Sequence, residues 1–447
     1  MNRRQFAALA ASAAILPALP SAARAHVAAG AIDAGDHGAV PGSPHDQSAA
    51  IQAALDAASA ADRVLFLPPG RYSVANLTLP QRCRVAGVAG ASILAFRGGG
   101  HLLSGRGCSI VRLDGLVIDG MALPLWETVP GTLHLSDCAD VGITSCRFTG
   151  SAQAAIALDR CGGRIAGNDI DHAAVGMRLI ESTGLSVTNN AVADCADNGI
   201  LVHRWSPGED GTIVSDNRVE RIGAASGGTG PYGNGINVYQ AHGVIITGNR
   251  VADCAFSAVR ANGANAVTIS GNNCARLGET AIYSEFAFEG AVIADNIVDT
   301  AATGISVANF IDGGRIATVA GNIVRNLTGS GPYPADPPGF GNGIYVEADS
   351  TVTGNVVDSG PLAGIWLGWG PYLRNVVASA NVIRGTRFGI AVSVVEGVGP
   401  VVIAGNLIAE TAEGGIFGYR WADRATGDLT GGASPNSTLL LSNNRLG

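Results

Sequence analysis

The side chains best suited to chemistry recur at two fixed positions in a segment that begins with Gly-Ile or a close variant. The second and fourth residues after that glycine alternate with apolar residues, so they share one face of an extended segment. The candidate catalytic residues at these positions are Arg260, Glu285, Glu347, His203 and Tyr239. The candidate sugar-binding residues at or near them are Asn262, Tyr283, Tyr345, Trp366 and Trp369.

Two kinds of reaction on a polysaccharide would use these groups. Hydrolysis needs an acid and a base, which Glu285 and Glu347 could supply if their carboxyl groups lie about 6.5–9.5 Å apart, as in inverting glycosidases. Elimination from a uronate needs a base and a cation that neutralises the substrate carboxylate. The chain has no lysine, so Arg260 would supply the charge and His203 or Tyr239 would take the proton. The residue types favour neither mechanism strongly.

The same residues also have structural interpretations. Arg260 and Glu285 fall in adjacent repeats and could form a simple ion pair. A second column predicts such pairing without chemistry, because its charges alternate along the chain. That column contains Asp299, Arg325, Asp358 and Arg384. The tyrosines and tryptophans could likewise be a stacked aromatic column that contacts no ligand.

One repeat unit must position these side chains, and its constant feature is an asparagine. Most intervals between these asparagines are 22 to 27 residues, and three are longer. They are Asn168, Asn190, Asn217, Asn249, Asn272, Asn296, Asn322, Asn355, Asn381, Asn406 and Asn444. A unit of this length with period-2 alternation predicts one coil of a β-helix, and stacked coils would let the asparagines hydrogen-bond along the stack. Asparagine also tolerates a left-handed corner. We predict an all-β, single-stranded right-handed parallel β-helix (a solenoid).

An amphipathic helix is predicted once, within an N-terminal cap at 26–62. Its apolar stripe consists of Ile51, Ala54, Leu55 and Ala58, with Asp46 as the N-cap. A solenoid needs its open end covered, so we expect this α-helix to cap the coils of 63–447. At the other end the repeat continues to 439–446. We expect the segment 420–437 or another chain to cover that edge.

Two insertions interrupt the repeat at the same turn. They span 223–233 and 328–341, are rich in glycine and proline, and both contain Gly-Pro-Tyr. Function in a β-helix resides on outward side chains and on such loops. We therefore predict that the insertions form two walls of a groove that contains Arg260 and Glu285.

Cysteine and acidic residues do not indicate a cofactor. Most of the eight cysteines occupy apolar positions of the repeat and are predicted to be buried thiols. Cys138 and Cys161 take matching positions in consecutive coils, so the sequence leaves open whether they are bonded. Asp194, Asp197 and Asn198 could hold calcium at a turn but are expected to make Asx-turns. We predict no metal and no cofactor.

The first residues predict export. Residues 2–6 (Asn-Arg-Arg-Gln-Phe) resemble the twin-arginine motif, although Ala7 stands where that motif usually has leucine. An apolar stretch at 7–19 and Ala-Arg-Ala at 23–25 complete a signal peptide over 1–25, with a simple secretory signal as the alternative. We expect a periplasmic or secreted protein. No later stretch is apolar enough to anchor it.

The composition excludes other classes. The chain of 447 residues is 47% hydrophobic, too apolar for disorder. Its net charge of -8 and its lack of a basic run argue against a nucleic-acid partner.

Residues 33–40 (Asp-Ala-Gly-Asp-His-Gly-Ala-Val) and 67–72 (Leu-Pro-Pro-Gly-Arg-Tyr) resemble the opening of pectate-lyase-like β-helices. With the export signal, the chain resembles the twin-arginine-translocated repetitive protein family, which has no assigned activity. The resemblance implies the fold and a superfamily of lyases, hydrolases, epimerases and adhesins. No catalytic signature of these enzymes occurs here, so no residue role is carried over.

We therefore expect an exported carbohydrate-active protein, a polysaccharide lyase or glycoside hydrolase, that works in a groove around 235–290 and 343–369. Its partner would be a polysaccharide. The alternatives are a non-catalytic glycan-binding or envelope-structural repeat protein, and a scaffold that binds protein through its C-terminal edge.

Overall fold

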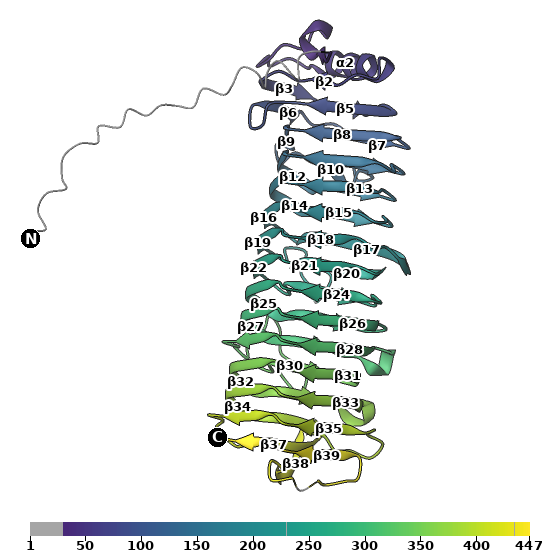
Figure 1. Cartoon of the computed structure of the whole chain (residues 1–447). Coiled ribbons are helices and arrows are strands. Elements are labelled where there is room, and N and C mark those ends of the chain that lie inside the picture. The colour runs from purple at the N-terminus through teal and green to yellow at the C-terminus, as the bar shows by residue number, and fades with distance from the viewer. Residues whose placement is uncertain (1–29, 229, 433) are drawn as a thin grey trace, which may run out of the picture.

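The computed structural model describes residues 30–228, 230–432 and 434–447. They form one elongated stack of coils, with strands running across the long axis and the helix α2 at the N-terminal end (Figure 1). This confirms the predicted parallel β-helix. The predicted signal peptide at 1–25 lies outside the described residues, and the division into cap and coils stays a prediction.

One sheet runs the length of the stack and has 16 strands. In spatial order they are β1 (Ile32–Asp33), β2 (Leu65–Phe66), β5 (Arg82–Ala86), β8 (Ile110–Asp114), β11 (Val141–Thr144), β13 (Gly163–Ala166), β15 (Ser186–Thr188), β18 (Ile213–Ser215), β21 (Ile245–Thr247), β24 (Val267–Ser270), β26 (Glu289–Ala294), β28 (Arg315–Ala320), β31 (Ala348–Thr353), β33 (Arg374–Ser379), β35 (Val401–Ala404) and β39 (Leu439–Ser442).

The other faces of the coils form a continuous sheet of 24 strands, because several strands bend around a corner of the coil. They are β3 (Gly70–Val74), β4 (Leu77–Thr78), β6 (Ser92–Phe96), β7 (Leu103–Arg106), β9 (Val117–Asp119), β10 (Gly131–Ser136), β12 (Arg147–Asp159), β14 (Asp169–Ile180), β16 (Ala191–Cys195), β17 (Asn198–Glu209), β19 (Arg218–Ile222), β20 (Asn234–His242), β22 (Arg250–Cys254), β23 (Val259–Asn262), β25 (Asn273–Glu285), β27 (Ile297–Val307), β29 (Ile323–Arg325), β30 (Ile344–Val346), β32 (Val356–Leu367), β34 (Val382–Ser393), β36 (Leu407–Ala409), β37 (Ile416–Arg420), β38 (Asp423–Asp428) and β40 (Arg445–Leu446).

The helices are few and short. α2 (Ser48–Ala60) buries the predicted stripe of Ile51, Ala54, Leu55 and Ala58 against the first coils. Its N-cap is Gln47, so the prediction of Asp46 is wrong by one residue, although Asp46 accepts the N–H of Ser48 (2.9 Å). Three 3₁₀ turns complete the set: η1 (Ala34–His37), η2 (Phe310–Asp312) and η3 (Gly370–Tyr372).

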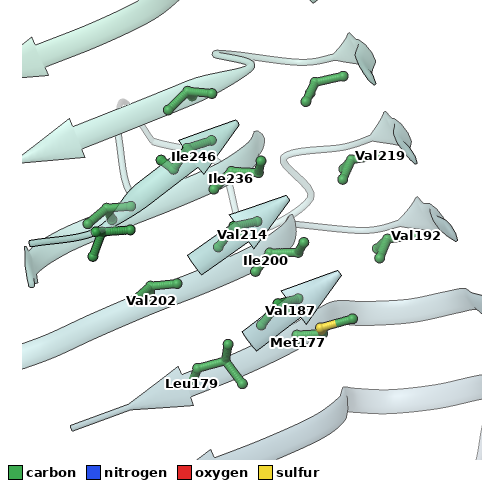
Figure 2. Close-up of a cluster of buried hydrophobic side chains, with 14 of the residues drawn as sticks. Met177, Leu179, Val187, Val192, Ile200, Val202, Val214, Val219, Ile236 and Ile246 are labelled. Atoms are coloured by element: carbon green, nitrogen blue, oxygen red, sulfur yellow. The ribbon is translucent and has the colours of Figure 1, made fainter. Parts of the chain in front are cut away.

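Inward side chains of successive coils stack directly on one another. Val187, Val214 and Ile246 come from three consecutive coils of the 16-stranded sheet and occupy one register position. They pack against inward residues of the other sheet such as Ile200 and Ile236, and all five are buried (Figure 2). Because one coil has no core of its own, this stacking between coils is what buries apolar surface.

The predicted asparagine ladder is present. The backbone N–H and Nδ2 of Asn168 both donate to Oδ1 of Asn190 (3.0 and 2.9 Å), and the pattern repeats down to Asn444. The repeat asparagines do not themselves take the left-handed conformation that asparagine tolerates. The preceding residue takes it, as at Gly167 (φ 65°) and Asp216 (φ 57°). The asparagine itself acts as a buried hydrogen-bonding group.

All eight cysteines, which lie in the described part, are buried and free, Cys138 and Cys161 included. Arg325 pairs with Asp299 (2.7 Å), as expected for the salt-bridge column. The C-terminal excursion forms β38, which pairs antiparallel with β37 and so covers part of that edge.

Candidate functional site

The predicted outward residues lie in register on the 24-stranded sheet. His203 pairs with Tyr239, Tyr239 with Asn262, and Asn262 with Glu285 on consecutive coils of β17, β20, β23 and β25. The column continues to Glu347, which directly follows β30. The alternation that predicted one shared face is therefore correct.

Arg260 is the centre of a buried ion network. Its Nε and Nη2 donate to the two oxygens of Glu285 (2.6 and 3.0 Å), and its Nη1 donates to Glu279 (3.2 Å). Asn262 Nδ2 also donates to Glu285 (3.0 Å), and the guanidinium carbon lies 5.0 Å from the centre of the Tyr283 ring. The side chain of Arg260 is only 11% exposed. Arg260 and Glu285 thus form the ion pair that the structural interpretation of the sequence proposed.

The hydrogen bonds of this network hold the guanidinium of Arg260 and the carboxylate of Glu285 in place. Burial raises the pKa of Glu285, while Arg260 and Asn262 oppose the rise by stabilising the carboxylate. Arg260 has two carboxylates as partners, so its charge is already balanced inside the protein. A substrate carboxylate would have to displace one of them.

A hollow of about 300 Å³ opens beside this network, between the sheet and the inserted segment 328–341. Four of the predicted residues line it, and they are Tyr283, Tyr345, Glu347 and Trp369. Arg260, Asn262 and Glu285 do not line it: Glu285 ends the same strand, β25, that carries Tyr283, and Arg260 and Asn262 lie on the preceding strand β23. The structure therefore brings three of the four predicted aromatic binding residues together with one of the two predicted glutamates.

Glu347 is the buried carboxyl of the hollow. It is 6% exposed, its Oε1 accepts the hydroxyl of Tyr345 (2.6 Å), and its Oε2 accepts the N–H of Phe310 (2.6 Å). Burial raises the pKa of Glu347 because these two donors replace only part of its hydration. A carboxyl of this kind can hold a proton at a pH where an ordinary glutamate has lost it, which is the property of a general acid.

The inserted segment 328–341 forms a wall whose Tyr333 contacts the coils beneath it. The hydroxyl of Tyr333 donates to Glu279, and its ring stacks on Phe256 (6.3 Å between ring centres) and packs on Phe340 (5.6 Å). Through Glu279 this wall joins the network of Arg260. The other insertion also reaches Arg260, since a Cβ on Gly230 would lie 3.0 Å from its guanidinium carbon.

The three remaining predicted residues, Trp366, His203 and Tyr239, also lie outside the hollow. Trp366 is buried under Trp369, packs on Tyr419 (4.7 Å between ring centres) and donates Nε1 to the carbonyl of Gly368. His203 and Tyr239 pack against each other (5.7 Å) on earlier coils of the same face. Burial, helped by the charge of Arg178, lowers the pKa of His203 to about 4.

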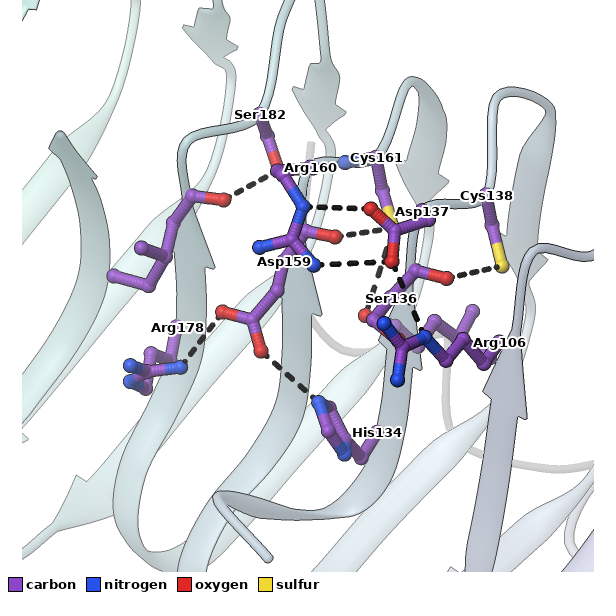
Figure 3. A network of polar contacts seen from close by, with 12 residues as sticks. Arg106, His134, Ser136, Asp137, Cys138, Asp159, Arg160, Cys161, Arg178 and Ser182 are labelled. Carbon is purple, nitrogen blue, oxygen red and sulfur yellow. Dashed lines mark hydrogen bonds and ion pairs between the residues drawn. The ribbon is translucent and has the colours of Figure 1, made fainter.

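Further towards the N-terminus, the outward polar groups pair with one another across coils (Figure 3). Asp159 accepts hydrogen bonds from His134 Nε2 (2.9 Å) and Arg178 Nη1 (3.0 Å), and Arg160 Nε donates to Asp137 (2.6 Å). These contacts are the cross-coil pairing expected of a solvated β-sheet face.

Sequence reasoning missed several residues of the hollow and its wall. They are Asp336, Asn342, Tyr333, Phe340 and Glu279. Four of them belong to the insertion or directly follow it, so their position depends on a loop conformation that the repeat does not specify. The Gly-Pro-Tyr shared by both insertions was the available signal for Tyr333.

Within the described residues, no group of three or more His, Cys, Asp or Glu side chains could hold a metal ion. Asp194 instead accepts a hydrogen bond from Arg221 (2.8 Å), and Asp197 accepts the N–H of Ser226 (2.7 Å). Among the same residues, no helix has the length and hydropathy to cross a membrane.

Two family models match parts of the chain. The model described as right-handed β-helix region matches residues 208–373, which agrees with the predicted handedness. The model described as periplasmic copper-binding protein (NosD) matches residues 104–276. Among the described residues, no cluster of three or more His, Cys, Asp or Glu side chains fits a copper ion. No curated protein matches the sequence.

Solved β-helix structures are similar in fold. The catalytic unit of a GH87 α-1,3-glucanase from Streptomyces thermodiastaticus is 17% identical, with a TM-score of 0.47 over 93% of this chain and 69% of that one. The surface adhesin PfbA of Streptococcus pneumoniae is 18% identical (TM-score 0.48, 87% and 91%). An exopolygalacturonase from Thermotoga maritima is 11% identical (TM-score 0.44, 88% and 92%). At these identities and TM-scores the likeness assigns no activity to this chain.

Proposed function

We propose that the protein is an exported glycoside hydrolase that cleaves a polysaccharide in the hollow beside the wall 328–341. The observation that carries the proposal is Glu347, a buried carboxyl with a raised pKa that faces a hollow lined with aromatic rings. Aromatic faces bind sugar rings, and a few polar groups orient them. Tyr283, Tyr345 and Trp369 supply the faces.

Glu347 is the general acid of the proposed reaction. It would protonate the glycosidic oxygen as the bond to the leaving sugar breaks, which requires the protonated form that burial favours. Asp336 is the second carboxyl that lines the hollow, and it lies exposed on the wall while Glu347 lies on the sheet. We assign it as the base that activates water, which makes the mechanism inverting.

The contacts of Arg260 support hydrolysis over elimination. An eliminating enzyme needs a cation that is free to neutralise a uronate carboxylate. Arg260, the cation predicted for that role, is bound to both Glu285 and Glu279. Glu285 is likewise held by hydrogen bonds from Arg260 and Asn262, so Asp336 replaces it as the partner of Glu347 in the proposed mechanism.

Mass spectrometry of the products tests the reaction. The mature protein is incubated with a panel of neutral and acidic polysaccharides, and fragments are compared with those from Glu347→Gln. Saturated fragments that require Glu347 support the proposal. Unsaturated fragments, one water lighter, would show a lyase and return Arg260 to consideration.

A second candidate function is glycan binding without cleavage. The observation in its favour is that the predicted acid/base pair of Glu285 and Glu347 is split, because Glu285 is held by Arg260 and Asn262. Binding to a glycan in affinity electrophoresis, together with no fragments from any member of the panel, would select this function.

We infer that the protein acts outside the cytoplasm. The inference rests on the twin-arginine-like residues 2–6 and the apolar stretch 7–19. The periplasmic and surface locations named for the similar proteins agree with it. Replacing Arg3 and Arg4 by lysine should retain the protein in the cytoplasm, as cell fractionation would show.

A further inference from the structure

The charged groups that line the hollow are carboxyls. Asp336 and Glu347 both line it, and among its described lining residues there is no arginine. The chain has no lysine anywhere, so arginine is the only permanently charged cation that its side chains could provide. A carboxylate that entered this hollow would be brought close to Asp336, which carries a charge of the same sign, and would find no cation among the described lining residues.

The nearest arginines are already paired. Arg260 donates to Glu285 and Glu279, and Glu279 also accepts the hydroxyl of Tyr333. Arg374, whose guanidinium carbon lies 4.3 Å from the centre of the Phe310 ring, donates to Asp349 (2.8 Å). Releasing either arginine for a substrate would leave a protein carboxylate without its partner, which is costly where that carboxylate is buried.

The uncharged polar side chains that line the hollow can form hydrogen bonds with hydroxyl groups. Asn342 lines the hollow and is buried, and its Nδ2 donates to the carbonyl of Gly339 (3.0 Å). That bond fixes the orientation of the amide, so the other atom is the acceptor Oδ1, which has no hydrogen-bond partner among the described residues. A buried acceptor without a partner is unfavourable until a donor arrives. A sugar hydroxyl can donate to it, whereas a carboxylate cannot.

We propose that the hollow selects uncharged hexose polymers and discriminates against uronates. The inference rests on the proposed glycan-binding function and adds the substrate class. Trp369 and the tyrosines bind the faces of the sugar rings, Asn342 accepts a hydroxyl, and the carboxylate of Asp336 repels acidic sugars.

Matched pairs of polymers test the selection. Polygalacturonate and alginate are each compared with their carboxyl-reduced forms, which keep the backbone and replace every carboxylate by a hydroxymethyl group, and neutral glucans and galactans complete the panel. Affinity of the mature protein is measured by affinity electrophoresis and calorimetry at low and high salt. We expect neutral polymers to bind at least about tenfold more tightly than acidic ones, with little dependence on salt, since no ion pair forms.

A charge reversal makes the test specific to the hollow. Asp336→Arg changes an exposed residue of the wall and should raise the affinity for uronate polymers by about tenfold at low salt. The matched control is Glu127→Arg, which makes the same change of charge on an exposed residue between β9 and β10. The control should leave uronate affinity unchanged.

The outcomes separate this inference from the function on which it rests. A uronate polymer could instead bind more tightly than its reduced form, lose affinity as salt is added, and bind the Trp369→Ala variant less tightly. That result would show that the selection for neutral sugars is wrong, while glycan binding in the hollow stands. Equal gains in Asp336→Arg and Glu127→Arg would also overturn it, because the hollow would then not sense charge. If no polymer of either kind binds, both the inference and the proposed function are wrong.

Discussion

Two glutamates of one column, Glu285 and Glu347, differ in chemistry because of their partners. Glu285 faces a guanidinium, which favours the ionised form. Glu347 faces a tyrosine hydroxyl and a backbone N–H, which are weaker compensation for lost water. A buried carboxyl with only neutral partners can act as an acid, while one in an ion pair serves the fold. Position in the repeat does not decide the role.

Replacing Glu347 by glutamine should abolish most activity and leave the fold intact. The amide cannot give up a proton, so the rate should fall by about 10²- to 10⁴-fold. In the native protein, activity should fall as pH rises through the pKa of Glu347, which burial places above the ordinary value of 4.5. Initial rates across pH and thermal unfolding of both proteins check this. Full activity in the variant would remove Glu347 from the mechanism.

His203 should make the protein less stable in mild acid. Its pKa is lowered from 6.5 to about 4 in the folded protein, so below pH 6.5 the unfolded chain binds more protons. Stability is therefore lost as pH falls, by about 2 kcal/mol between pH 8 and pH 5. The variant His203→Gln has no titrating side chain at this position, so its free energy of unfolding should fall correspondingly less over the same pH range.

Urea unfolding of both proteins at the two pH values measures the difference. The comparison between variants matters, because ion-paired aspartates also lose stability on acidification. Equal losses in the two proteins would show that His203 is not held neutral by the fold.

At the scale of the element, the asparagine column stabilises the corner of every coil. Asn296 Oδ1 accepts two bonds from Asn272, and its Nδ2 donates to Asn322 and to the carbonyl of Ile269. Asn296→Ala leaves the buried backbone N–H of Asn272 without its partner and removes one hydrogen bond each from Asn272 Nδ2, Asn322 Oδ1 and the carbonyl of Ile269. We expect it to cost about 2–4 kcal/mol, from about 1–3 kcal/mol for the unsatisfied group and about 0.5–1.5 kcal/mol for each other lost bond, after some relaxation.

The end of the ladder provides the comparison. Asn444 accepts from Asn406 but is only half-buried, so water can replace it. Asn444→Ala should therefore lower the midpoint of unfolding by much less than Asn296→Ala. Similar shifts for the two variants would mean that the hydrogen bonds of the ladder contribute little.

The elements could be predicted from the sequence because their cause is periodic. Asparagine spacing and alternation specify the coil, and Ile51 with Leu55 specifies the capping face. Only one of the two carboxylate partners of Arg260 could be predicted from the sequence. Glu285 follows from the register, whereas Glu279 reaches Arg260 because β25 is irregular between Leu277 and Thr280. Pattern reasoning cannot place such a bend, nor the loop that carries Asp336.

At the scale of the whole molecule, the solenoid separates stability from function. Each coil contacts its neighbours, so stability is close to a sum of coil and interface contributions. Insertions at turns, such as 328–341, contribute little to that sum except where they contact the coils, as Tyr333 does through Phe256 and Glu279. Removing the wall should therefore leave the stack of coils folded but destroy the hollow.

Replacing residues 329–340 by two glycines tests this separation. We expect the midpoint of thermal unfolding to change by a few degrees, because the coils on either side keep their ladder through Asn322 and Asn355. Glycan affinity should fall at least tenfold, since Asp336 and one side of the hollow are removed. Tyr333→Phe is the companion variant: it keeps the ring packing, loses only the bond to Glu279 and should retain binding. Unfolding of the shortened protein would show that the wall is part of the stack, and undiminished binding would locate the glycan elsewhere on the outward face.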